Sequence, residues 1–433
     1  MRVLVVGNGG REHALVWKLR QSPQVTELFC APGNPGIAAL ADCVPIDGSN
    51  IVELADFALS VNINLTVVGP ELPLDLGIVD EFEKRNLPIF GPSETAAELE
   101  SSKVFAKEFM RKHKIPTGRF EIAGSIEEAR GVLKKGDMKL PVVLKADGLA
   151  GGKGVLICET KKHVEEALEL FMTERKFGNA GDRIVVEEFL EGIEISFQVI
   201  SDGKKVLPLA TSQDHKKLFE GDRGPNTGGM GAFSPALSMN KEMHLSVMNQ
   251  VILPAVAGMA AEGRPYRGVL YAGLMLTKQG PRVLEFNCRF GDPETQSLLP
   301  RMECDLAGVL MSAVTGRLDE AKVEWKREAA VCVVVASAGY PGTIESGREI
   351  TGIDQAEKLE NVIVFHAGTA KKDDKLVSSG GRVLGVTATA PHLSSACDRA
   401  YAAIGKIQFE GMQYRKDIAQ KALQHLGNAN KLE

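Results

Sequence analysis

A metal- and phosphate-binding arrangement is predicted around Glu285, Asn287 and Arg289. Residues 283–287 are mostly apolar strand formers, and side-chain alternation along a strand places Glu285 and Asn287 on one face. A carboxylate and an amide oxygen at this spacing form half of a site for Mg²⁺, which prefers oxygen ligands. Arg289 keeps the same parity, so its guanidinium would lie beside the metal, where a phosphate would bind. The pattern predicts phosphoryl transfer, with an edge strand that runs into a polar loop as the alternative.

A constrained acidic turn follows this strand. Gly291 and Pro293 interrupt regular structure, and Asp292 and Glu294 add two carboxylates within the turn. Together with the preceding strand, they form the expected floor of a phosphoryl-transfer site.

A glycine-rich segment lies between two predicted strands, 141–146 and 155–158. The first strand carries Lys145, and residues 148–154 contain four glycines around Lys153, so backbone N–H groups can wrap a phosphate. A P-loop joins a strand to a helix and has a different spacing, so the segment is not a Walker A motif. We predict a flexible hairpin that folds down over a nucleotide, with a structureless turn as the alternative.

Two other segments carry candidate nucleotide ligands. Lys103 stands at the start of a predicted helix, 104–113, where a positive charge opposes the helix dipole, so it is either a phosphate ligand or a plain surface lysine. A predicted strand at 183–188 runs into an acidic stretch. There, backbone groups of 187–190 could read an adenine edge and Glu194 could bind ribose hydroxyls, with an acidic hairpin as the alternative.

The chain begins with a strand, a glycine turn and a helix. Residues 2–6 and 14–20 have strand and helix patterns, and Gly9, Gly10 and Arg11 lie between them, near a helix N-terminus that favours an anion. The turn departs from the dinucleotide fingerprint because a glutamate replaces its third glycine, which argues against NAD. An anion site and a plain tight turn both remain open here.

Length and composition limit the classes of protein. The chain of 433 residues should form roughly two to four domains, and 44% hydrophobic with 25% charged residues is ordinary for a globular protein. A net charge of -5 gives no basic footprint for nucleic acid. The seven cysteines form no CxxC pair, no signal peptide is visible, and the longest apolar run, 329–338, is too short to span a membrane. We therefore expect a cytoplasmic protein with free thiols, no zinc site, and neither nucleic acid nor membrane as partner.

Short strands alternate with helices in the N-terminal part, including a helix expected at 75–86, which predicts a parallel α/β sheet. Ligands of such sheets bind at the carboxyl ends of strands, where Glu71 follows the strand 65–68. Residues 212–235 are predicted to form a long polar loop that closes over a ligand. From about residue 327 the pattern becomes α+β without a dense chemical cluster, so this segment should cover the site rather than supply its chemistry.

In chain order, a strand lysine, a glycine hairpin, an acid-rich strand and a Glu-x-Asn strand with a nearby arginine resemble the ATP-grasp ligases, in which two α+β lobes hold ATP between them. The segments 7–13, 226–231 and 289–296 are more specific, and over essentially its whole length the chain resembles the glycinamide ribonucleotide synthetase (phosphoribosylamine–glycine ligase) family. The resemblance implies an N-terminal parallel α/β domain (1–102), an ATP-grasp two-lobe core (103–325) with 120–192 as its smaller, nucleotide-covering lobe, and a C-terminal α+β domain (326–433).

The resemblance also implies an activity in de novo purine biosynthesis. ATP, glycine and 5-phosphoribosylamine would give glycinamide ribonucleotide, ADP and phosphate through glycyl phosphate, with Mg²⁺ or Mn²⁺ as cofactor. A transient contact with the neighbouring pathway enzyme that makes the unstable amine is a further expectation. An ATP-grasp carboxylase that uses bicarbonate and a non-catalytic ATP-sensing module are the alternatives.

The roles implied by the resemblance fall into four groups. Arg289 would be catalytic, while Glu285 and Asn287 would hold the metal. The strand 270–275 lacks the additional metal-binding acid of many ATP-grasp enzymes, so the metal should bind weakly without nucleotide. ATP would be bound by Lys103, Lys145, Gly151, Gly152, Lys153, Gly154, Glu187, Leu190 and Glu194. The other substrates would be bound by Gly9, Gly10, Arg11, Asp214, Asn226, Thr227, Asp292, Pro293 and Glu294.

Overall fold

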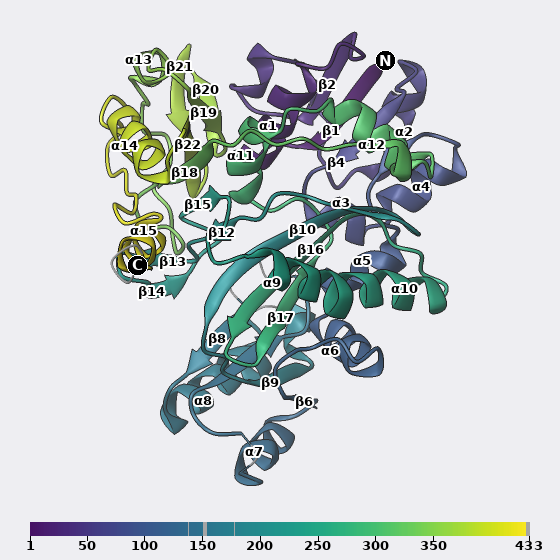
Figure 1. The fold of residues 1–433 in the computed structure, drawn as a ribbon, viewed down its shortest axis with the longest axis vertical. Helices are drawn as coiled ribbons and strands as arrows, with labels where there is room; N and C mark the ends of the chain where they lie inside the picture. The colour runs from purple at the N-terminus through teal and green to yellow at the C-terminus, as the bar shows by residue number, and fades with distance from the viewer. Residues whose placement is uncertain (137, 150–153, 177, 430–433) are drawn as a thin grey trace.

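The N-terminal part forms the predicted parallel α/β sheet (Figure 1). The structure is a computed structural model that describes residues 1–136, 138–149, 154–176 and 178–429. The N-terminal elements are β1 (Arg2–Gly7), α1 (Gly10–Leu19), β2 (Glu27–Pro32), β3 (Asp42–Cys43), α2 (Ile51–Ser60), β4 (Leu65–Val68), α3 (Glu71–Asp75), α4 (Ile78–Lys84), β5 (Ile89–Phe90) and α5 (Glu94–Ser101). The strand order β3-β2-β1-β4-β5 reverses at β1, so the loops after β1 and β4 meet at the carboxyl edge, where ligands bind in such folds.

The helix predicted at 75–86 is present but shorter, as α4 (Ile78–Lys84). A separate short helix, α3, comes before it, and Leu76 and Gly77 lie between the two helices. Gly77 has φ +80°, a left-handed conformation that glycine adopts without strain and that ends a helix. Glu71 therefore begins α3 at the carboxyl end of β4.

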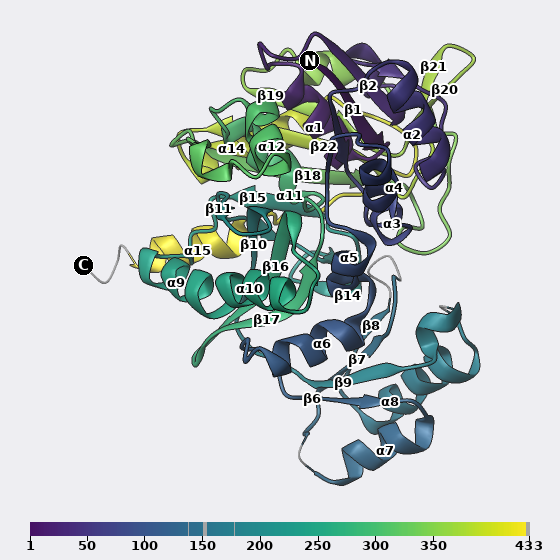
Figure 2. The same ribbon diagram turned by 90° about the vertical axis from the view of Figure 1, so that its right-hand side faces the viewer.

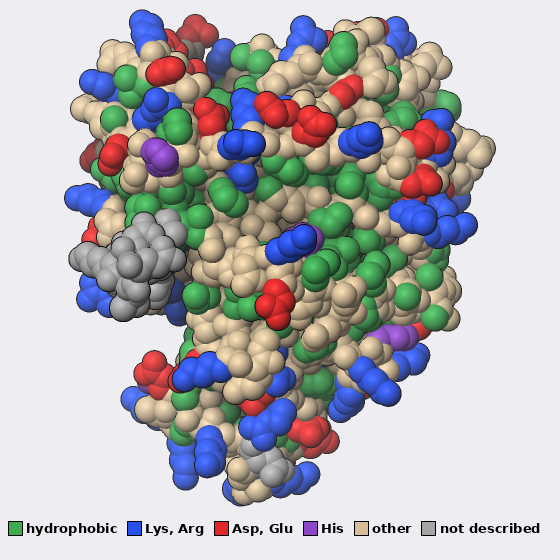
Figure 3. Space-filling view, viewed as in Figure 1, with side chains coloured by type: hydrophobic (Ala, Val, Ile, Leu, Met, Phe, Trp, Pro, Cys, Tyr) green, Lys and Arg blue, Asp and Glu red, His purple; other side chains and the backbone are tan. Residues whose placement is uncertain are grey.

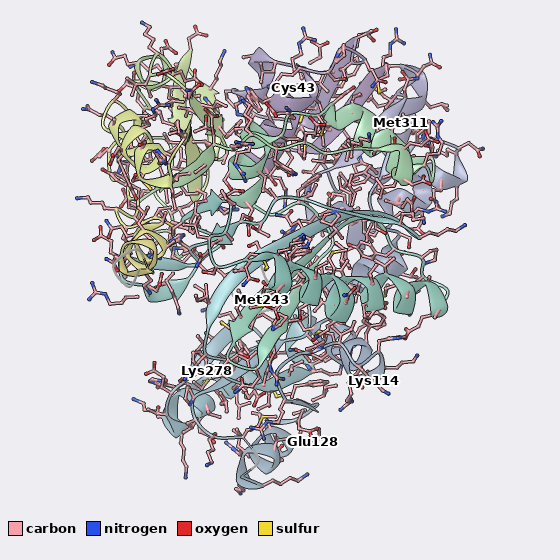
Figure 4. The ribbon with its side chains drawn as sticks, viewed as in Figure 1. Cys43, Lys114, Glu128, Met243, Lys278 and Met311 are labelled. Atoms are coloured by element: carbon pink, nitrogen blue, oxygen red, sulfur yellow. The ribbon has the colours of Figure 1, made fainter. Side chains whose placement is uncertain are left out.

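A small lobe projects away from the rest of the molecule, as Figure 2 shows. Its elements are β6 (Phe120–Ala123), α7 (Ile126–Lys134), β7 (Val142–Ala146), β8 (Val155–Cys158), α8 (Lys161–Leu168) and β9 (Ile184–Glu188). The antiparallel sheet has the order β6-β9-β7-β8 and packs its own apolar core against α7 and α8. Helix α6 (Lys103–Lys112) leads into this lobe, and Glu128 on α7 marks its outer part in Figure 4.

A second antiparallel sheet faces the small lobe and has the order β11-β10-β16-β17. Its elements are β10 (Ile193–Asp202), β11 (Val206–Pro208), α9 (Lys241–Val247), α10 (Leu253–Ala261), β16 (Arg267–Thr277), β17 (Gly280–Asn287) and α12 (Leu306–Val314). Strands β16 and β17 form the predicted hairpin. The hairpin presents residues 285–287 toward the small lobe, since Lys145 of β7 donates to the backbone of Leu284.

Helices α9 and α10 are joined through a π-helical turn, so Lys241–Ala261 is one continuous helix. By length and composition alone this is the one helix, within the part of the chain that the structure describes, that could cross a membrane. Here it covers the second sheet, and Val251, Ile252 and Val256 belong to the protein core. Hydrophobic side chains appear on the outer face over these helices in Figure 3.

The C-terminal sheet takes two of its strands from the middle of the chain. It has the order β12-β15-β18-β22-β19. The elements are β12 (Gln213–Asp214), β13 (Lys217–Phe219), β14 (Arg223–Asn226), β15 (Gly231–Ser234), β18 (Ala329–Ala336), β19 (Val362–His366), β20 (Thr369–Lys372), β21 (Lys375–Ser378), β22 (Arg382–Ala390), α14 (Leu393–Ile404) and α15 (Gln420–Ala429). The structureless loop predicted at 212–235 is therefore wrong, because its backbone finds partners in β18 and in its own hairpin, β13–β14.

The N-terminal and C-terminal sheets meet at two buried histidines. His13 on α1 accepts a hydrogen bond at Nδ1 from the backbone N–H of His366 on β19, at 2.8 Å. Gly36 lies against both rings, and a β-carbon there would come within 2.5 Å of each. Burial, together with the neighbouring His366, lowers the pKa of His13 to about 3, and burial lowers the pKa of His366 to about 4. Both side chains are neutral at neutral pH.

These histidines make the folded protein sensitive to acid. Their folded pKa values lie below the ordinary histidine value of 6.5, so their contribution to stability is complete above pH 6.5. Below pH 6.5 the unfolded chain takes up protons that the folded chain does not. We expect the free energy of unfolding to fall by up to about 1.4 kcal/mol per pH unit for each histidine. Chemical denaturation between pH 7.5 and pH 5 measures this slope; His13→Phe should remove part of it, whereas the exposed His392→Asn should not.

Candidate active site

The predicted metal-binding strand is β17, and Glu285 lies among three lysines. Lys216 Nζ is 3.3 Å from Glu285 Oε1. The Lys216 ammonium, with Lys145 and Lys103 nearby, lowers the pKa of Glu285 to about 2 although burial opposes this. Lys216 also lies 2.5 Å from Glu194 Oε1, and despite its burial these carboxylates raise the pKa of its ammonium well above the usual value. The result is an ionised carboxylate surrounded by cations, which suits a polyanion bound through a divalent ion.

Arg289 joins the end of β17 to two other segments. Its NH2 donates to Asn287 Oδ1 at 3.0 Å and to Glu100 Oε1 at 2.8 Å. Its Nε lies 3.4 Å from Glu71 Oε2. Burial would raise the pKa of Glu71, but Arg289 and Arg11 outweigh burial and lower it to about 2. The guanidinium is thus held in one orientation by carboxylates from α3 and α5.

The donor set fits a hard divalent cation. Glu285 offers an ionised carboxylate and Asn287 an amide oxygen, which are ligands of the kind that Mg²⁺ and Mn²⁺ bind. Within the described ranges, no group of three or more His, Cys, Asp or Glu residues could hold a metal. A metal at this strand would therefore take its remaining ligands from water or from substrate phosphates.

Two of the predicted phosphate-binding lysines lie at the junction of the lobes. Lys103 Nζ donates to the backbone oxygen of Gly148 at 2.8 Å, at the start of the glycine segment. Lys145 Nζ lies 2.6 Å from Glu187 Oε2 and donates to the oxygen of Leu284 at 2.9 Å. Both lysines contribute to the positive field at Glu285.

The strands around the glycine segment pair as predicted, since β7 and β8 form an antiparallel hairpin. Gly154 is buried at the start of β8, and its oxygen accepts from the backbone N–H of Ala146 at 2.9 Å. Gly151, Gly152 and Lys153 lie outside the described residues.

The predicted adenine-binding segment includes one side chain that is turned inward. The Glu187 carboxylate is only 2% exposed and pairs with both Lys145 and Lys107. The Glu187 carboxylate is therefore occupied by the two lysines and is turned away from a base. Leu190 is half-buried, and the Glu194 side chain is 33% exposed while paired with Lys216. Leu190 and Glu194 thus keep surface that a nucleoside could contact.

The acidic turn contributes a second, deeper cluster. Glu294 Oε1 accepts from Ser196 Oγ at 2.9 Å and from Tyr271 OH at 2.6 Å. Burial and the nearby Glu294 raise the pKa of Asp214 well above its usual range. An amine or ammonium group beside Asp214 would favour its ionised form, so this cluster could receive such a group.

The end of β14 and the segment after it lie beside these acids. Thr227 is buried, and its Oγ1 donates to the backbone oxygen of Lys216 at 2.8 Å. Asn226 is the partner of Lys217 in the β13–β14 hairpin. Gly229 approaches the turn so closely that a β-carbon there would lie 2.4 Å from Pro293 and 2.8 Å from Asp214. The structure thus brings the predicted Asp214, Asn226, Thr227 and Pro293 into one region.

The N-terminal glycine turn lies against the same acidic turn. A β-carbon on Gly9 would lie 3.7 Å from Asp292 Oδ2, and one on Gly10 would lie 2.7 Å from the Gln296 amide. Arg11 is only 6% exposed, because its guanidinium pairs with Glu12 at 2.6 Å and donates to the oxygen of Phe290 at 3.2 Å. Arg11 therefore braces the turn and offers little surface to a ligand.

The C-terminal unit supplies a side chain that sequence reasoning missed. Arg382 of β22 donates to Asp292 Oδ2 at 3.0 Å, to the backbone oxygen of Asp292 at 2.8 Å, and to the oxygen of Gly228 at 2.5 Å. Burial would raise the pKa of Asp292, but Arg382 and Arg11 outweigh it and lower that pKa. The C-terminal unit therefore does more than cover the site, since it also holds a residue of the acidic turn. The signal in the sequence that could have marked Arg382 is the pair of glycines directly before it.

Two lobes that meet at lysines from one side and at a Glu-x-Asn strand from the other define an ATP-grasp protein. The sequence matches three domain families of phosphoribosylglycinamide synthetase: the N domain over residues 1–100, the ATP-grasp (A) domain over 101–295 and the C domain over 330–421. The chain belongs to the phosphoribosylglycinamide synthetase family.

Individual relatives agree with this assignment. A phosphoribosylamine–glycine ligase of Caldanaerobacter subterraneus subsp. tengcongensis is 51% identical over 419 residues, which cover 97% of this chain and 99% of the relative. The crystal structure of the phosphoribosylamine–glycine ligase of Thermotoga maritima has a TM-score of 0.83 and 37% identity, covering 97% of this chain and 100% of that one. The biotin carboxylase domain of the Hydrogenobacter thermophilus 2-oxoglutarate carboxylase, with a TM-score of 0.72, 18% identity and coverage of 95% and 91%, shares the fold alone.

Proposed function

We propose that the chain is an ATP-dependent ligase that joins glycine to 5-phosphoribosylamine, giving glycinamide ribonucleotide, ADP and phosphate in de novo purine biosynthesis. Family membership over the whole chain supports this activity. The structural observation that carries it is the position of Glu285 among Lys216, Lys145 and Lys103. On the same strand, Asn287 accepts a hydrogen bond from Arg289. We place the reaction in the cytoplasm, with transient contact to the enzyme that supplies the amine.

The chemistry needs no protein nucleophile. A glycine carboxylate oxygen attacks the γ-phosphorus of ATP, and ADP leaves. The amine nitrogen then attacks the carbonyl carbon of glycyl phosphate, phosphate leaves with that carboxylate oxygen, and the nitrogen loses a proton. Catalysis of both steps is positioning and charge stabilisation.

We assign the roles of the residues from their positions in the site. The phosphates are bound by Lys103, Lys145, Lys216 and the glycine segment with Gly154. The nucleoside is bound by Leu190 and the Glu194 carboxylate, and Glu187 acts by orienting Lys145. Glu285 and Asn287 would hold Mg²⁺ or Mn²⁺, which would supply neutralisation of phosphate charge. Arg289 stabilises the transferring phosphoryl group, and its guanidinium is oriented by Glu71 and Glu100. Residues 1–102, 103–325 and 326–433 form the substrate-side domain, the ATP-grasp core and the C-terminal domain.

The two non-nucleotide substrates bind at the acidic turn. The Asp214–Glu294 pair holds an amine or ammonium group, which relieves the unfavourable proximity of the two carboxylates. Asn226, Thr227 and Pro293 shape this pocket. Asp292, held by Arg382, together with the backbone of Gly9 and Gly10 and the buried Arg11, forms its wall toward the N-terminal sheet.

ADP release with defined substrates tests the activity. We expect release to require glycine together with ribosylamine generated in place, and bicarbonate to have no effect. Bicarbonate-dependent release without glycine would identify a carboxylase instead. ATP binding without turnover under any of these conditions would identify a nucleotide-sensing module.

Metal binding should depend on nucleotide. The site has one carboxylate and one amide oxygen, and the Lys216 ammonium competes with a cation for Glu285. We expect titration calorimetry, or Mn²⁺ electron paramagnetic resonance, to show only weak binding to nucleotide-free protein and much tighter binding with ADP present. Glu285→Gln should weaken the nucleotide-dependent binding. Tight stoichiometric binding by the nucleotide-free protein would contradict the proposed ligand set.

A further inference from the structure

The β13–β14 hairpin joins two groups of proposed substrate-binding residues. Asp214 and Lys216 precede it, and Asn226 and Thr227 end it. Residues 219–225 are all exposed, so the tip of the hairpin has little of the core to rest on. Something other than apolar packing must therefore fix its position.

Arg415 supplies a buried polar anchor for this hairpin. Its side chain is 1% exposed and is among the largest fully buried side chains of the described residues. Two of its nitrogens donate to the two oxygens of Asp417, each at 2.7 Å. The third donates to Asp222 Oδ1 at 2.9 Å and to the backbone oxygen of Lys217 at 3.0 Å. One guanidinium thus ties the C-terminal segment to both the first strand and the turn of the hairpin.

Neighbouring contacts repeat the same connection. The backbone N–H of Gly221 donates to Asp417 Oδ2 at 2.8 Å, and Lys421 pairs with Asp222. The backbone N–H of Ala419 donates to His215 Nε2 at 3.2 Å. Figure 1 shows α15, whose first turn contains Lys421, beside β13 and β14. The segment 415–421 therefore grips the hairpin at its turn and at its base.

The base of the hairpin transmits this grip to the site. The backbone N–H of Thr227 donates to the oxygen of Lys216 at 2.8 Å, and that of His215 donates to the oxygen of Gly231 at 2.9 Å. Because the two ends are hydrogen-bonded to each other, a displacement of the hairpin would move Asp214, Lys216 and Thr227 together. A shift of about 1 Å in such groups can cost about 10²-fold in rate.

We infer that Arg415 is a positioning residue: the C-terminal segment 415–421 sets the place of Asp214, Lys216 and Thr227 by holding the β13–β14 hairpin through Asp222. The inference rests on the proposed function of those three residues. Arg415 would give the C-terminal unit a second role in the reaction, separate from that of Arg382. This role would be indirect, because the residues of segment 415–421 touch no substrate.

The test uses the full chain and two levels of perturbation. Asp222→Asn removes the charge on the hairpin side at a residue whose side chain is 38% exposed, and it leaves the Arg415–Asp417 pair intact, so the protein should fold. Arg415→Met removes the anchor, and Arg415→Lys restores a charge without the planar fork. Arg348→Gln is the matched control, because Arg348 of the same unit pairs only with exposed carboxylates of Glu345 and Glu410.

Two readouts are needed, taken well below the unfolding temperature. Hydrogen exchange of residues 213–229 should rise in Asp222→Asn and more in Arg415→Met, while β18 and β22 stay protected. The kcat/KM for glycine should fall about tenfold in Asp222→Asn and about 10²-fold in Arg415→Met, with partial recovery in Arg415→Lys. ADP affinity should fall by a smaller factor than kcat/KM for glycine, because Lys216 moves with the hairpin while Lys103 and Lys145 come from other elements. Arg348→Gln should match the wild type in both readouts.

Each contrary result has a distinct meaning. Unchanged exchange at 213–229 in both variants would show that Arg415 does not hold the hairpin, and would overturn the inference while the proposed function stands. Faster exchange with wild-type kinetics would overturn the inference through its premise, the assignment of Asp214, Lys216 and Thr227 to the site. Activity that falls only in proportion to the unfolded fraction would reduce Arg415 to a structural role.

Discussion

Arg289→Ala should lower kcat by about 10²–10³-fold, the loss expected when one preorganised donor to the developing charge is removed. Arg289 is fixed by Glu100 at 2.8 Å and by Asn287 at 3.0 Å, so in the wild type its guanidinium is already oriented before phosphate arrives. Arg289→Lys should recover only part of the rate, because an ammonium keeps the charge but lacks the planar fork. Single-turnover measurement of ADP formation separates this loss from slow product release.

The matched control is Arg267→Ala. Arg267 lies on β16 of the same sheet and makes an exposed pair with Glu83 at 3.3 Å, so its removal should leave the rate unchanged. Direct titration with ADP should show that Arg289→Ala still binds nucleotide through the lysines. Turnover of Arg289→Ala within tenfold of the wild type would exclude Arg289 from the phosphoryl-transfer step.

Glu187→Gln should lower the free energy of unfolding by about 3–5 kcal/mol, the usual cost of removing one partner from a buried ion network. Glu187 is 2% exposed and neutralises Lys107 and Lys145, whose side chains are 3% and 7% exposed. Chemical denaturation gives the loss, and hydrogen exchange in β7 and β9 locates it in the small lobe. The variant should also bind ATP more weakly, since Lys145 loses the group that orients it.

The pH dependence adds a signature to this prediction. Burial and the neighbouring Lys145 lower the pKa of Lys107 to about 8, so the folded chain binds fewer protons than the unfolded chain above that pH, and stability rises with pH there. Without Glu187 the pKa of Lys107 should fall further, so this rise should begin at lower pH. The control Glu188→Gln loses the charge of a pair with the exposed Arg119 but keeps an amide oxygen that can accept from the Arg119 backbone N–H, so it should cost about 0–1 kcal/mol. Equal stability of the two variants would contradict the buried network.

The elements that carry the chemistry were predictable from sequence because their patterns are local. Alternation along 283–287 predicted the strand with Glu285 and Asn287, and glycine spacing predicted the β7–β8 hairpin. The parallel N-terminal sheet was predictable for the same reason, since strands ending in glycine or proline alternate there with helices.

The contacts between distant segments could not be predicted from the sequence. Arg382 reaches Asp292 across 90 residues, and Glu100 reaches Arg289 across 189. Residues 212–235 looked like a loop because the partner of β15 is β18, which begins at Ala329. A glutamate such as Glu187 has the same appearance in sequence whether its carboxylate faces a ligand or, as here, two buried lysines.

Transfer of an oxygen atom tests the central claim most directly, namely that the γ-phosphoryl group passes to the glycine carboxylate at the strand carrying Glu285 and Arg289. Glycine labelled with ¹⁸O in its carboxylate would be turned over with ATP and ribosylamine, and the released phosphate analysed by mass spectrometry or ³¹P nuclear magnetic resonance. The account predicts one ¹⁸O in each phosphate released, because the bridging oxygen of glycyl phosphate leaves with phosphorus. Unlabelled phosphate alongside full formation of glycinamide ribonucleotide would contradict it.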